Sequence, residues 1–124
     1  ILHYFHDIGK FMKILFQLLK PGGQIVLNDF HPFRKVMPIN FFKSSVENYF
    51  DTTIHSGDVA FKDSLEQVEN EEFPNCSYRL YNLSEIINSM ITSGFTIKEF
   101  NEEPSWTNEK LPGEFTIYAM KEET

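Results

Sequence analysis

The sequence has few of the residues and patterns that mark several large classes of protein. Cys76 is the single cysteine among 124 residues, so no disulfide framework can form within the chain, and no Cys-x-x-Cys pair indicates a zinc or redox site. No apolar run approaches the roughly 18 residues of a membrane span, and no signal peptide is visible. The four histidines and the carboxylates show no metal-ligand spacing. These absences favour a cytoplasmic protein without a metal site.

Positive charge is also scarce, above all in the second half of the chain. The formal net charge is −7, with +2 over residues 1–62 and −9 over residues 63–124. An acidic surface repels phosphate backbones, which argues against a nucleic-acid partner. Hydrophobic residues make up 41% of the chain and 13 residues are phenylalanine, which is ample for a packed core. The length limits the chain to one small domain.

The first regular pattern is a helix followed by a tight turn and a strand. Asp7 is a suitable N-cap, and the apolar residues after it recur along one helix face until Pro21 and two glycines stop it. The run Ile25-Val26-Leu27 can be buried on both faces and leads into the polar residues Asn28, Asp29 and His31. The pattern predicts a central parallel strand over about 24–30, whose C-terminal end opens onto a site.

The second regular pattern begins at residue 82 and runs to the end of the chain. Asn82 and Glu85 form a capping-box pattern, apolar residues continue one helix face, and Gly94 is the expected stop. We then expect a strand over 95–100, a polar turn over 102–113 and a last strand over 115–120. The last strand is apolar on both faces, which predicts a position inside the sheet. No helix separates it from the preceding strand, so the two can pair as an antiparallel hairpin.

Residues 31–82 are less regular and too long for a simple connection. Loops of this length are usually lids, binding elements or inserted subdomains, so we predict a cap or insert over this range. Within it, residues 63–72 form an acidic exposed segment and residues 77–81 alternate like a strand. A short amphipathic helix fits the apolar positions Phe42, Val46, Tyr49 and Phe50.

The order of these elements and their sequence motifs resemble those of the class I S-adenosylmethionine-dependent methyltransferases. The resemblance covers nearly the whole chain, but only the C-terminal half of the family's domain. It is carried by Leu19-Lys20-Pro21-Gly22-Gly23 before a strand, by His31-Pro32 after that strand, by Ser93-Gly94-Phe95 before the next strand, and by residues 115–121. A His-Pro pair at that place is similar to a small-molecule subgroup. The resemblance implies an α/β fold, the C-terminal part of a Rossmann-like sheet that ends in an antiparallel hairpin and carries an inserted cap.

The resemblance also implies that residues 1–124 are the C-terminal portion of one longer methyltransferase domain. Residues 2–7 are similar to the end of the family's fourth strand and its loop. The family binds its cofactor with a glycine-rich GxGxG turn and an acidic residue that holds the ribose, and this sequence contains neither element. We therefore expect a truncated chain that is inactive alone. Its parent would transfer a methyl group from S-adenosylmethionine to a small molecule, and the sheet edge left open would favour association of two copies.

Three groups of residues are candidates for the site. Leu2, His3 and Tyr4 stand where the family contacts its cofactor, with ordinary strand-end packing as the alternative. His31 is a candidate general base because imidazole titrates near neutral pH, although it could equally orient a substrate or cap a turn. Substrate contacts are predicted for Asp29, Arg79 and Trp106.

Each substrate candidate also has a plainer interpretation. Arg79 can bind a carboxylate or phosphate as a fork, or pair with an acidic residue at the surface. Trp106 can line a pocket or cover the core from a loop. For the chain as a whole, the rival to a methyltransferase is a non-catalytic interaction or dimerisation module that uses the acidic half as its contact surface. A nicotinamide-dependent Rossmann enzyme is a weaker alternative, because the final antiparallel hairpin argues against it.

Overall fold

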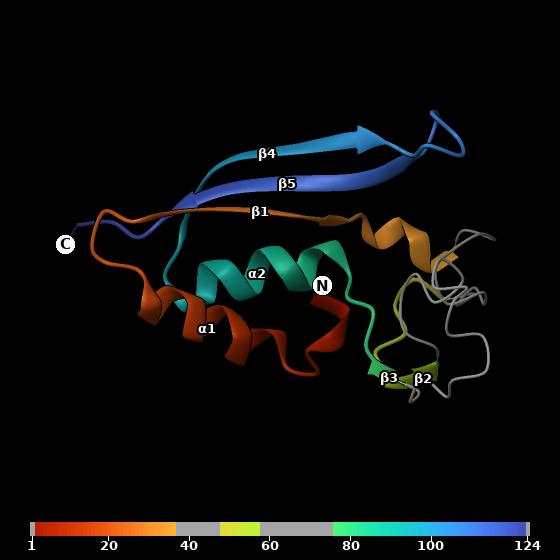
Figure 1. The fold of residues 1–124 in the computed structure, drawn as a ribbon, viewed down its shortest axis with the longest axis horizontal. Helices are drawn as coiled ribbons and strands as arrows, with labels where there is room; N and C mark the ends of the chain where they lie inside the picture. Colours follow the sequence, from red (N-terminus) through yellow and green to blue (C-terminus); the bar gives the residue numbers. More distant parts are fainter. Residues whose placement is uncertain (1, 37–47, 58–75, 124) are drawn as a thin grey trace, which may run out of the picture.

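The computed structural model describes residues 2–36, 48–57 and 76–123, which form two layers (Figure 1). A three-stranded sheet is one layer, and two helices packed against each other are the second. None of the helices in these ranges is long and apolar enough to cross a membrane. The elements in chain order are the 3₁₀ turn η1 (Leu2–Tyr4), α1 (Ile8–Leu18), β1 (Gln24–Phe30), the 3₁₀ turn η2 (Pro32–Val36), β2 (His55–Gly57), β3 (Cys76–Tyr78), α2 (Leu83–Ser93), β4 (Thr96–Pro104) and β5 (Pro112–Met120).

Helix α1 begins and ends as predicted. The Asp7 carboxylate accepts a hydrogen bond from the Lys10 N–H at 3.0 Å and caps the first turn. At the other end, the Lys121 ammonium group donates to the carbonyl oxygens of Phe16 and Leu19, at 3.1 and 3.0 Å. The Phe16 carbonyl also accepts the Leu19 N–H at 3.3 Å, so the ammonium group adds a second donor there and supplies one to the Leu19 carbonyl. The C-terminal cap therefore comes from a residue more than 100 positions away, which periodicity does not reveal.

Helix α2 also matches the sequence pattern at both ends. The capping box of Asn82 and Glu85 is present, and the Asn82 N–H donates to Glu85 Oε1 at 3.0 Å. Gly94 ends the helix with a left-handed φ of 114°. A Cβ atom on Gly94 would lie 2.8 Å from the Phe16 ring of α1, so the same glycine lets the two helices approach closely.

The sheet has the order β1-β5-β4, with β5 antiparallel to both neighbours. This confirms the antiparallel hairpin and the position of the last strand inside the sheet. The register pairs Leu27 with Ile117 and Asp29 with Phe115, so these four side chains share one face. That face packs on α1 and α2, and it holds the buried residues Leu27, Phe115, Ile117 and Ala119.

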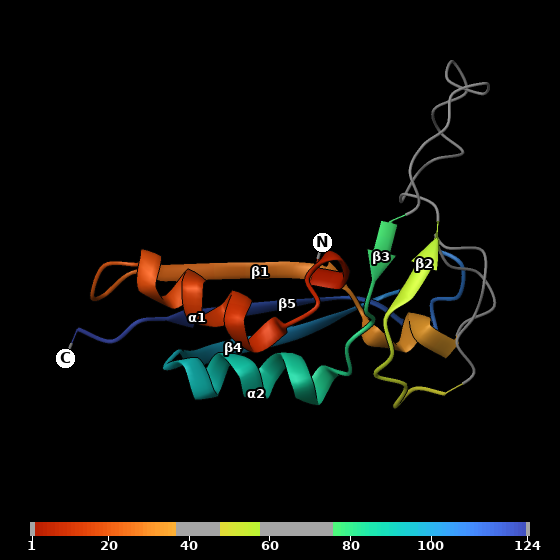
Figure 2. The ribbon, with the colours of Figure 1, turned by 90° about the horizontal axis from the view of Figure 1, so that it is seen from below.

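The burial predicted for β1 on both faces is wrong within the described residues. The helices cover one face of the sheet, as Figure 2 shows from below, and Val26 on the other face is 68% exposed. The apolar run Ile25-Val26-Leu27 therefore has one buried member, Leu27. β1 is also an edge strand of the described sheet, since β5 pairs with one side of it and no described strand pairs with the other.

The first residues and the middle of the chain depart from the predicted elements. Residues 2–4 form a 3₁₀ turn instead of a strand end, because no described strand pairs with them and Phe5 N–H closes the turn on the Leu2 carbonyl. The strand-like segment over 77–81 is shorter, as Cys76–Tyr78 pair with His55–Gly57 and irregular backbone follows. Most of the predicted helix around residues 42–50, and all of the acidic segment 63–72, lie outside the described residues.

Candidate functional site

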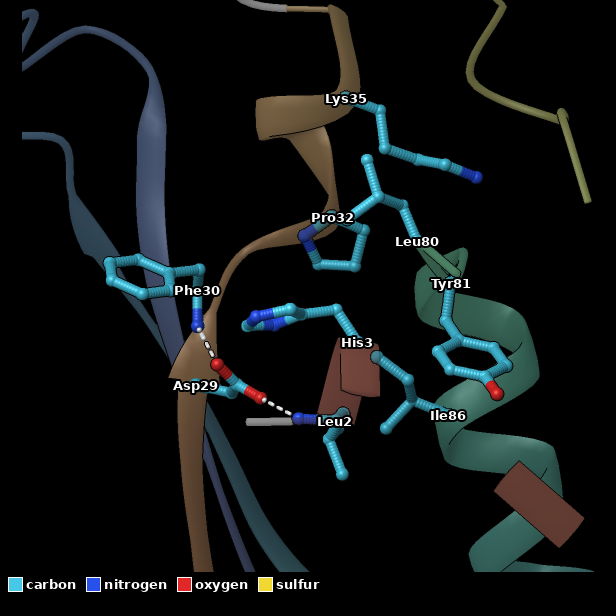
Figure 3. Close-up of a pocket in the computed structure, with 9 residues that line it drawn as sticks. All are labelled: Leu2, His3, Asp29, Phe30, Pro32, Lys35, Leu80, Tyr81 and Ile86. Carbon is cyan, nitrogen blue, oxygen red and sulfur yellow. Dashed lines mark hydrogen bonds between the residues drawn. The ribbon is translucent and has the colours of Figure 1, made fainter. Parts of the chain in front are cut away.

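A shallow pocket lies at the C-terminal end of β1, between the sheet and the start of α2 (Figure 3). Ligands of open α/β sheets collect at this end of the strands. The pocket has a volume of about 20 Å³, which is room for a water-sized group. Its lining comes from η1, the β1–η2 segment and α2 with the residues before it: Leu2, His3, Asp29, Phe30, Pro32, Lys35, Leu80, Tyr81 and Ile86.

Asp29 joins β1 to η1 at the edge of this pocket. Its carboxylate accepts hydrogen bonds from the backbone N–H groups of Leu2, at 2.9 Å, and of Phe30, at 2.7 Å. Burial by itself raises the pKa of the Asp29 carboxyl. The hydrogen bonds from the Leu2 and Phe30 N–H groups act in the opposite direction and lower that pKa. Asp29 is therefore an ionised group whose oxygens hold the backbone of the pocket.

Two of the three predicted cofactor residues, Leu2 and His3, reach the pocket. The His3 carbonyl accepts the Arg79 N–H at 2.8 Å, and the Tyr81 hydroxyl donates to the Phe5 carbonyl, so η1 is attached to the segment before α2. The His3 ring points toward Asp29 and Pro32 in Figure 3. Tyr4 contacts the His3 ring at 4.0 Å between centroids but does not line the pocket.

Lys35 is a pocket residue that sequence reasoning missed. Its ammonium group donates to the carbonyl oxygens of Tyr49 at 2.7 Å and Asp51 at 2.9 Å, and to Asn82 Oδ1 at 3.0 Å. The residue is 1% exposed, and burial lowers the pKa of Lys35 although the charges of Glu85 and Asp51 oppose that effect. A lone lysine in an irregular segment gave no periodic signal. The three oxygens that surround it come from two distant parts of the chain.

Arg79 takes the plainer of its two interpretations. Its guanidinium pairs with Glu85 at 2.5 Å, donates through Nε to the Thr52 carbonyl at 2.9 Å, and lies 4.4 Å from the centre of the Tyr81 ring. Burial by itself lowers the pKa of Arg79, but the bond to Glu85 and the contact with Tyr81 hold it above its usual value. Arg79 therefore braces the segment behind the pocket and does not line it.

His31 lies beside the pocket with both ring nitrogens engaged. Nε2 is 2.7 Å from Glu102 Oε2, Nδ1 accepts the Phe33 N–H at 3.1 Å, and the side chain is buried with its ring edge toward Phe115. Because Nδ1 accepts, Nε2 carries the proton that bonds to Glu102. This arrangement fits the role of a cap between β1 and η2 and leaves neither nitrogen turned toward a substrate. The general-base role stays a prediction that this geometry does not favour.

Trp106 does not line the pocket. It is 96% exposed in the turn between β4 and β5. Hydrogen bonds hold that turn, from Ser105 N–H to the Leu111 carbonyl and from Leu111 N–H to the Asn108 carbonyl. Of the predicted substrate residues, the structure therefore brings Asp29 to the pocket and leaves Arg79 and Trp106 outside it. Among the described residues, no group of three or more His, Cys, Asp or Glu side chains is placed to hold a metal ion.

Comparison with known proteins finds similarity in structure but not in sequence. No protein-family model matches the chain, and no curated protein matches it. A proposed S-adenosylmethionine-dependent methyltransferase from Listeria monocytogenes superposes with a TM-score of 0.67 and 16% identity. An S-adenosylmethionine-dependent methyltransferase from Mesorhizobium loti superposes with a TM-score of 0.65 and 19% identity.

The matches cover this chain almost completely and the neighbours only in part. They include 98% and 97% of this chain, which spans 58% of the length of each neighbour. The predicted α/β fold with its final antiparallel hairpin is thereby confirmed. The chain shares its fold with a part of S-adenosylmethionine-dependent methyltransferases.

Proposed function

We propose that this chain is the C-terminal portion of a domain that transfers a methyl group from S-adenosylmethionine to a small molecule in the cytoplasm. The fold shared with two such methyltransferases supports the reaction class. One observation supports the place of the reaction: residues expected to contact ligand from sequence, Leu2, His3 and Asp29, converge on a pocket at the strand end where α/β enzymes bind their ligands. Residues 31–82 would form much of the cap over it.

The described residues would supply only part of a cofactor site. η1 supplies Leu2 and His3 to the pocket, with Tyr4 beside them, and its backbone is attached to Asp29 and to Arg79. The sequence contains no glycine-rich GxGxG turn, and the pocket, with a volume of about 20 Å³, is too small for a nucleoside. When bound, the cofactor supplies a methyl carbon that is already activated by its sulfonium sulfur.

The protein's share of such a reaction is positioning. The pocket residues would orient the acceptor atom toward the methyl carbon that the bound cofactor would supply, and any proton on the acceptor would pass to solvent. Alignment of the two reactants can supply a large part of the rate, so a base is not obligatory. Asp29 holds η1 against β1, and His31 holds the start of η2, which carries Pro32 and Lys35 into the pocket wall. We assign acceptor contact to the pocket wall, with Asp29, Arg79 and His31 as positioning groups.

Transfer of a labelled methyl group tests the proposal. S-adenosylmethionine with a tritiated methyl group is incubated with small acceptors and the longest polypeptide that contains these 124 residues. The isolated chain is measured beside it by calorimetric titration. We expect transfer by the longer protein and no micromolar binding by the isolated chain, because the turn that holds the cofactor is not in its sequence. Absence of transfer and of cofactor binding in the longer protein would refute the proposal.

The rival function is a non-catalytic association module, and the free edge of β1 favours it. Among the described residues no strand pairs with that edge, and the exposed Val26 lies beside it. Such an edge is a template for another strand, including β1 of a second copy. Sedimentation of the isolated chain measures this association. Dimers that persist in the longer protein, together with no cofactor binding there, would favour the module over the enzyme.

A further inference from the structure

His31 occupies the N-cap position of η2. The turn begins at Pro32, which has no N–H, so Phe33 carries its first N–H group. Nδ1 of His31 accepts that N–H at 3.1 Å, which is the contact that an N-cap side chain makes with the backbone two residues ahead. The imidazole of His31 therefore does for η2 what an asparagine, aspartate or serine side chain does for many helices.

Side chains attach η2 to the rest of the described structure at both of its ends. His31 caps the start, and Lys35 near the other end donates to the oxygens of Tyr49, Asp51 and Asn82. Pro32 and Lys35 belong to the wall of the pocket, so the position of η2 sets part of that wall. Loss of the cap would leave η2 attached through Lys35.

A histidine cap differs from the usual capping residues in its response to acid. Amide and hydroxyl oxygens remain acceptors at mildly acidic pH, and carboxylates remain ionised there, whereas Nδ1 gains a hydrogen when an imidazole is protonated. The Phe33 N–H would then face a second N–H across a separation of 3.1 Å. Two donors cannot form a hydrogen bond with each other, so protonation of His31 breaks the cap.

The other contacts of His31 survive protonation. Its backbone N–H donates to the Gly113 carbonyl at 2.9 Å, and its Nε2 lies 2.7 Å from Glu102 Oε2. A proton on Nδ1 leaves both bonds in place and turns the contact with Glu102 into an ion pair, which is stronger than the neutral bond. The imidazole therefore stays with β4 and β5, and Phe33 is the partner that moves away.

The charged groups on β1 and η2 have partners of their own. Asp29, on the same face of β1 as His31, accepts the N–H groups of Leu2 and Phe30. The ammonium group of Lys35 is surrounded by the three oxygens that accept from it. The ring of His3 points toward Pro32 in Figure 3, and as an imidazole it also titrates near neutral pH. A test must therefore separate His31 from His3.

The carboxylates of the hairpin lie on both faces of the sheet. The register pairs Glu102 with Phe115 on the face that His31 shares, and pairs Glu103 with Glu114 on the opposite face. Glu103 accepts there from the Thr116 hydroxyl. Among the described residues, Glu102 is thus the hairpin carboxylate that contacts the imidazole.

We propose that η2 carries a pH-sensitive cap: protonation of His31 releases the Phe33 N–H and frees the start of η2, with the Pro32 part of the pocket wall, while Lys35 keeps the far end attached. This device needs no ligand and no methyl transfer, so it holds or fails independently of the proposed function.

NMR of the isotope-labelled chain between about pH 8 and about pH 5 tests the proposal. The ring signals of His31 report its tautomer, and we expect Nδ1 to be unprotonated at the upper end of this range. As His31 takes up a proton, the Phe33 amide signal should move with the same midpoint. Protection of the Phe33 amide against hydrogen exchange, corrected for the intrinsic effect of pH, should fall at least about tenfold.

Two substitutions assign the effect to His31. His31→Asn keeps an acceptor for the Phe33 N–H but does not titrate, so the Phe33 amide should lose its response to pH. Glu102→Gln keeps an acceptor for Nε2 and removes the negative charge, so the midpoints of His31 and Phe33 should move together to lower pH. The exposed His6 is the reference imidazole, and its titration should not affect Phe33. If His31→Asn does not fold, the coupled midpoints of the unaltered chain and of Glu102→Gln still decide the question.

Each contrary outcome overturns the proposal. A proton on Nδ1 at about pH 8 would mean that the cap has the other tautomer. Titration of His31 with unchanged protection of Phe33 would mean that the cap does not depend on that proton. A pH response of Phe33 that persists in His31→Asn would assign the effect to another group, such as His3. No proton uptake by His31 before the chain unfolds would mean that the folded chain has no such device.

Discussion

The core region and the pocket end of this molecule are stabilised by different interactions. In the core region, made of α1, α2 and the sheet, apolar side chains such as Met12, Met90 and Phe115 are completely buried. At the pocket end, made of η1, η2, residues 48–57 and the start of α2, side chains such as Lys35 and Arg79 donate to backbone carbonyls of distant segments. The first kind of contact leaves a periodic pattern in the sequence, and the second leaves none. The core region should therefore tolerate replacement of one apolar side chain by another of similar size, whereas the pocket end depends on individual hydrogen bonds.

The largest effect is expected from truncating the core. Phe115 is fully buried on the central strand, so Phe115→Ala leaves a cavity under both helices and is expected to lower the free energy of unfolding by about 3–5 kcal/mol. That is a large part of the roughly 5–15 kcal/mol that stabilises a domain. Chemical denaturation followed by circular dichroism measures the loss. Trp106→Ala in the exposed turn is the control, with a change within about 0.5 kcal/mol.

The next largest effect is expected from removing hydrogen bonds at the pocket end. Lys35→Met keeps the apolar stem and removes the ammonium group, which leaves two carbonyls and the Asn82 amide oxygen without their donor. We expect a loss of about 2–4 kcal/mol, with increased hydrogen exchange in residues 49–53 before any change in β5. A uniform increase across both regions would show that the pocket end is not a separate unit.

The pH dependence of the same variant sharpens the test. Burial lowers the pKa of Lys35 in the folded chain below the ordinary lysine value of about 10.4. Between the two values the unfolded chain binds a proton that the folded chain has released, so the free energy of unfolding rises with pH over that window. The stability of the unaltered chain relative to Lys35→Met should therefore grow as the pH rises through the last units below about 10.4. A difference that shrinks over this range would contradict the buried state of Lys35.

A smaller effect concerns the glycine between the two helices. Gly94→Ala places a Cβ atom 2.8 Å from the Phe16 ring at a left-handed φ of 114°, and we expect a loss of about 1–3 kcal/mol. The control is Gly9→Ala in the first turn of α1, where the nearest atom is Asp7 Oδ1 at 3.4 Å and φ is ordinary. That change is expected to stabilise the chain by about 0.4–1 kcal/mol. Equal effects of the two substitutions would mean that α1 and α2 do not pack as described.

The smallest effect is expected at the C-terminal end of α1. Lys121→Met removes the donor to the carbonyls of Phe16 and Leu19 and should cost about 1 kcal/mol. Lys98→Met, at an exposed position of β4, is the control and should be nearly neutral. Thermal melting of both variants decides whether this long-range cap contributes to stability.

The sequence predicts the helices and strands whose boundaries and faces depend on residues close together in the chain. Asp7, Asn82 and Gly94 act within one turn of the helix they begin or end, and these positions are confirmed. The burial of both faces predicted from the apolar run Ile25-Val26-Leu27 is wrong, because composition does not show whether a second layer covers the other face of a strand. The resemblance placed η1 and Asp29 near the same site, although it predicted a strand where a 3₁₀ turn stands.

The rest of the site depends on contacts between distant residues. Lys35 meets Tyr49, Asp51 and Asn82 only after the chain has folded, and no local pattern marks that meeting. His31 was singled out for the chemistry of imidazole, and the structure engages both of its nitrogens with Glu102 and Phe33. Titratable side chains in irregular segments are therefore the least predictable part of this molecule, because their partners are long-range.

The exposed turn at Trp106 has a practical consequence for anyone who studies this chain in solution. It is the single tryptophan of the sequence, and it is 96% exposed in the folded state, so its surroundings change little when the core melts. Its fluorescence is therefore expected to change little on unfolding. For the same reason, a blue shift of the emission reports an event at the β4–β5 turn and nowhere else, which makes this residue a built-in optical sensor for whatever approaches that end of the hairpin.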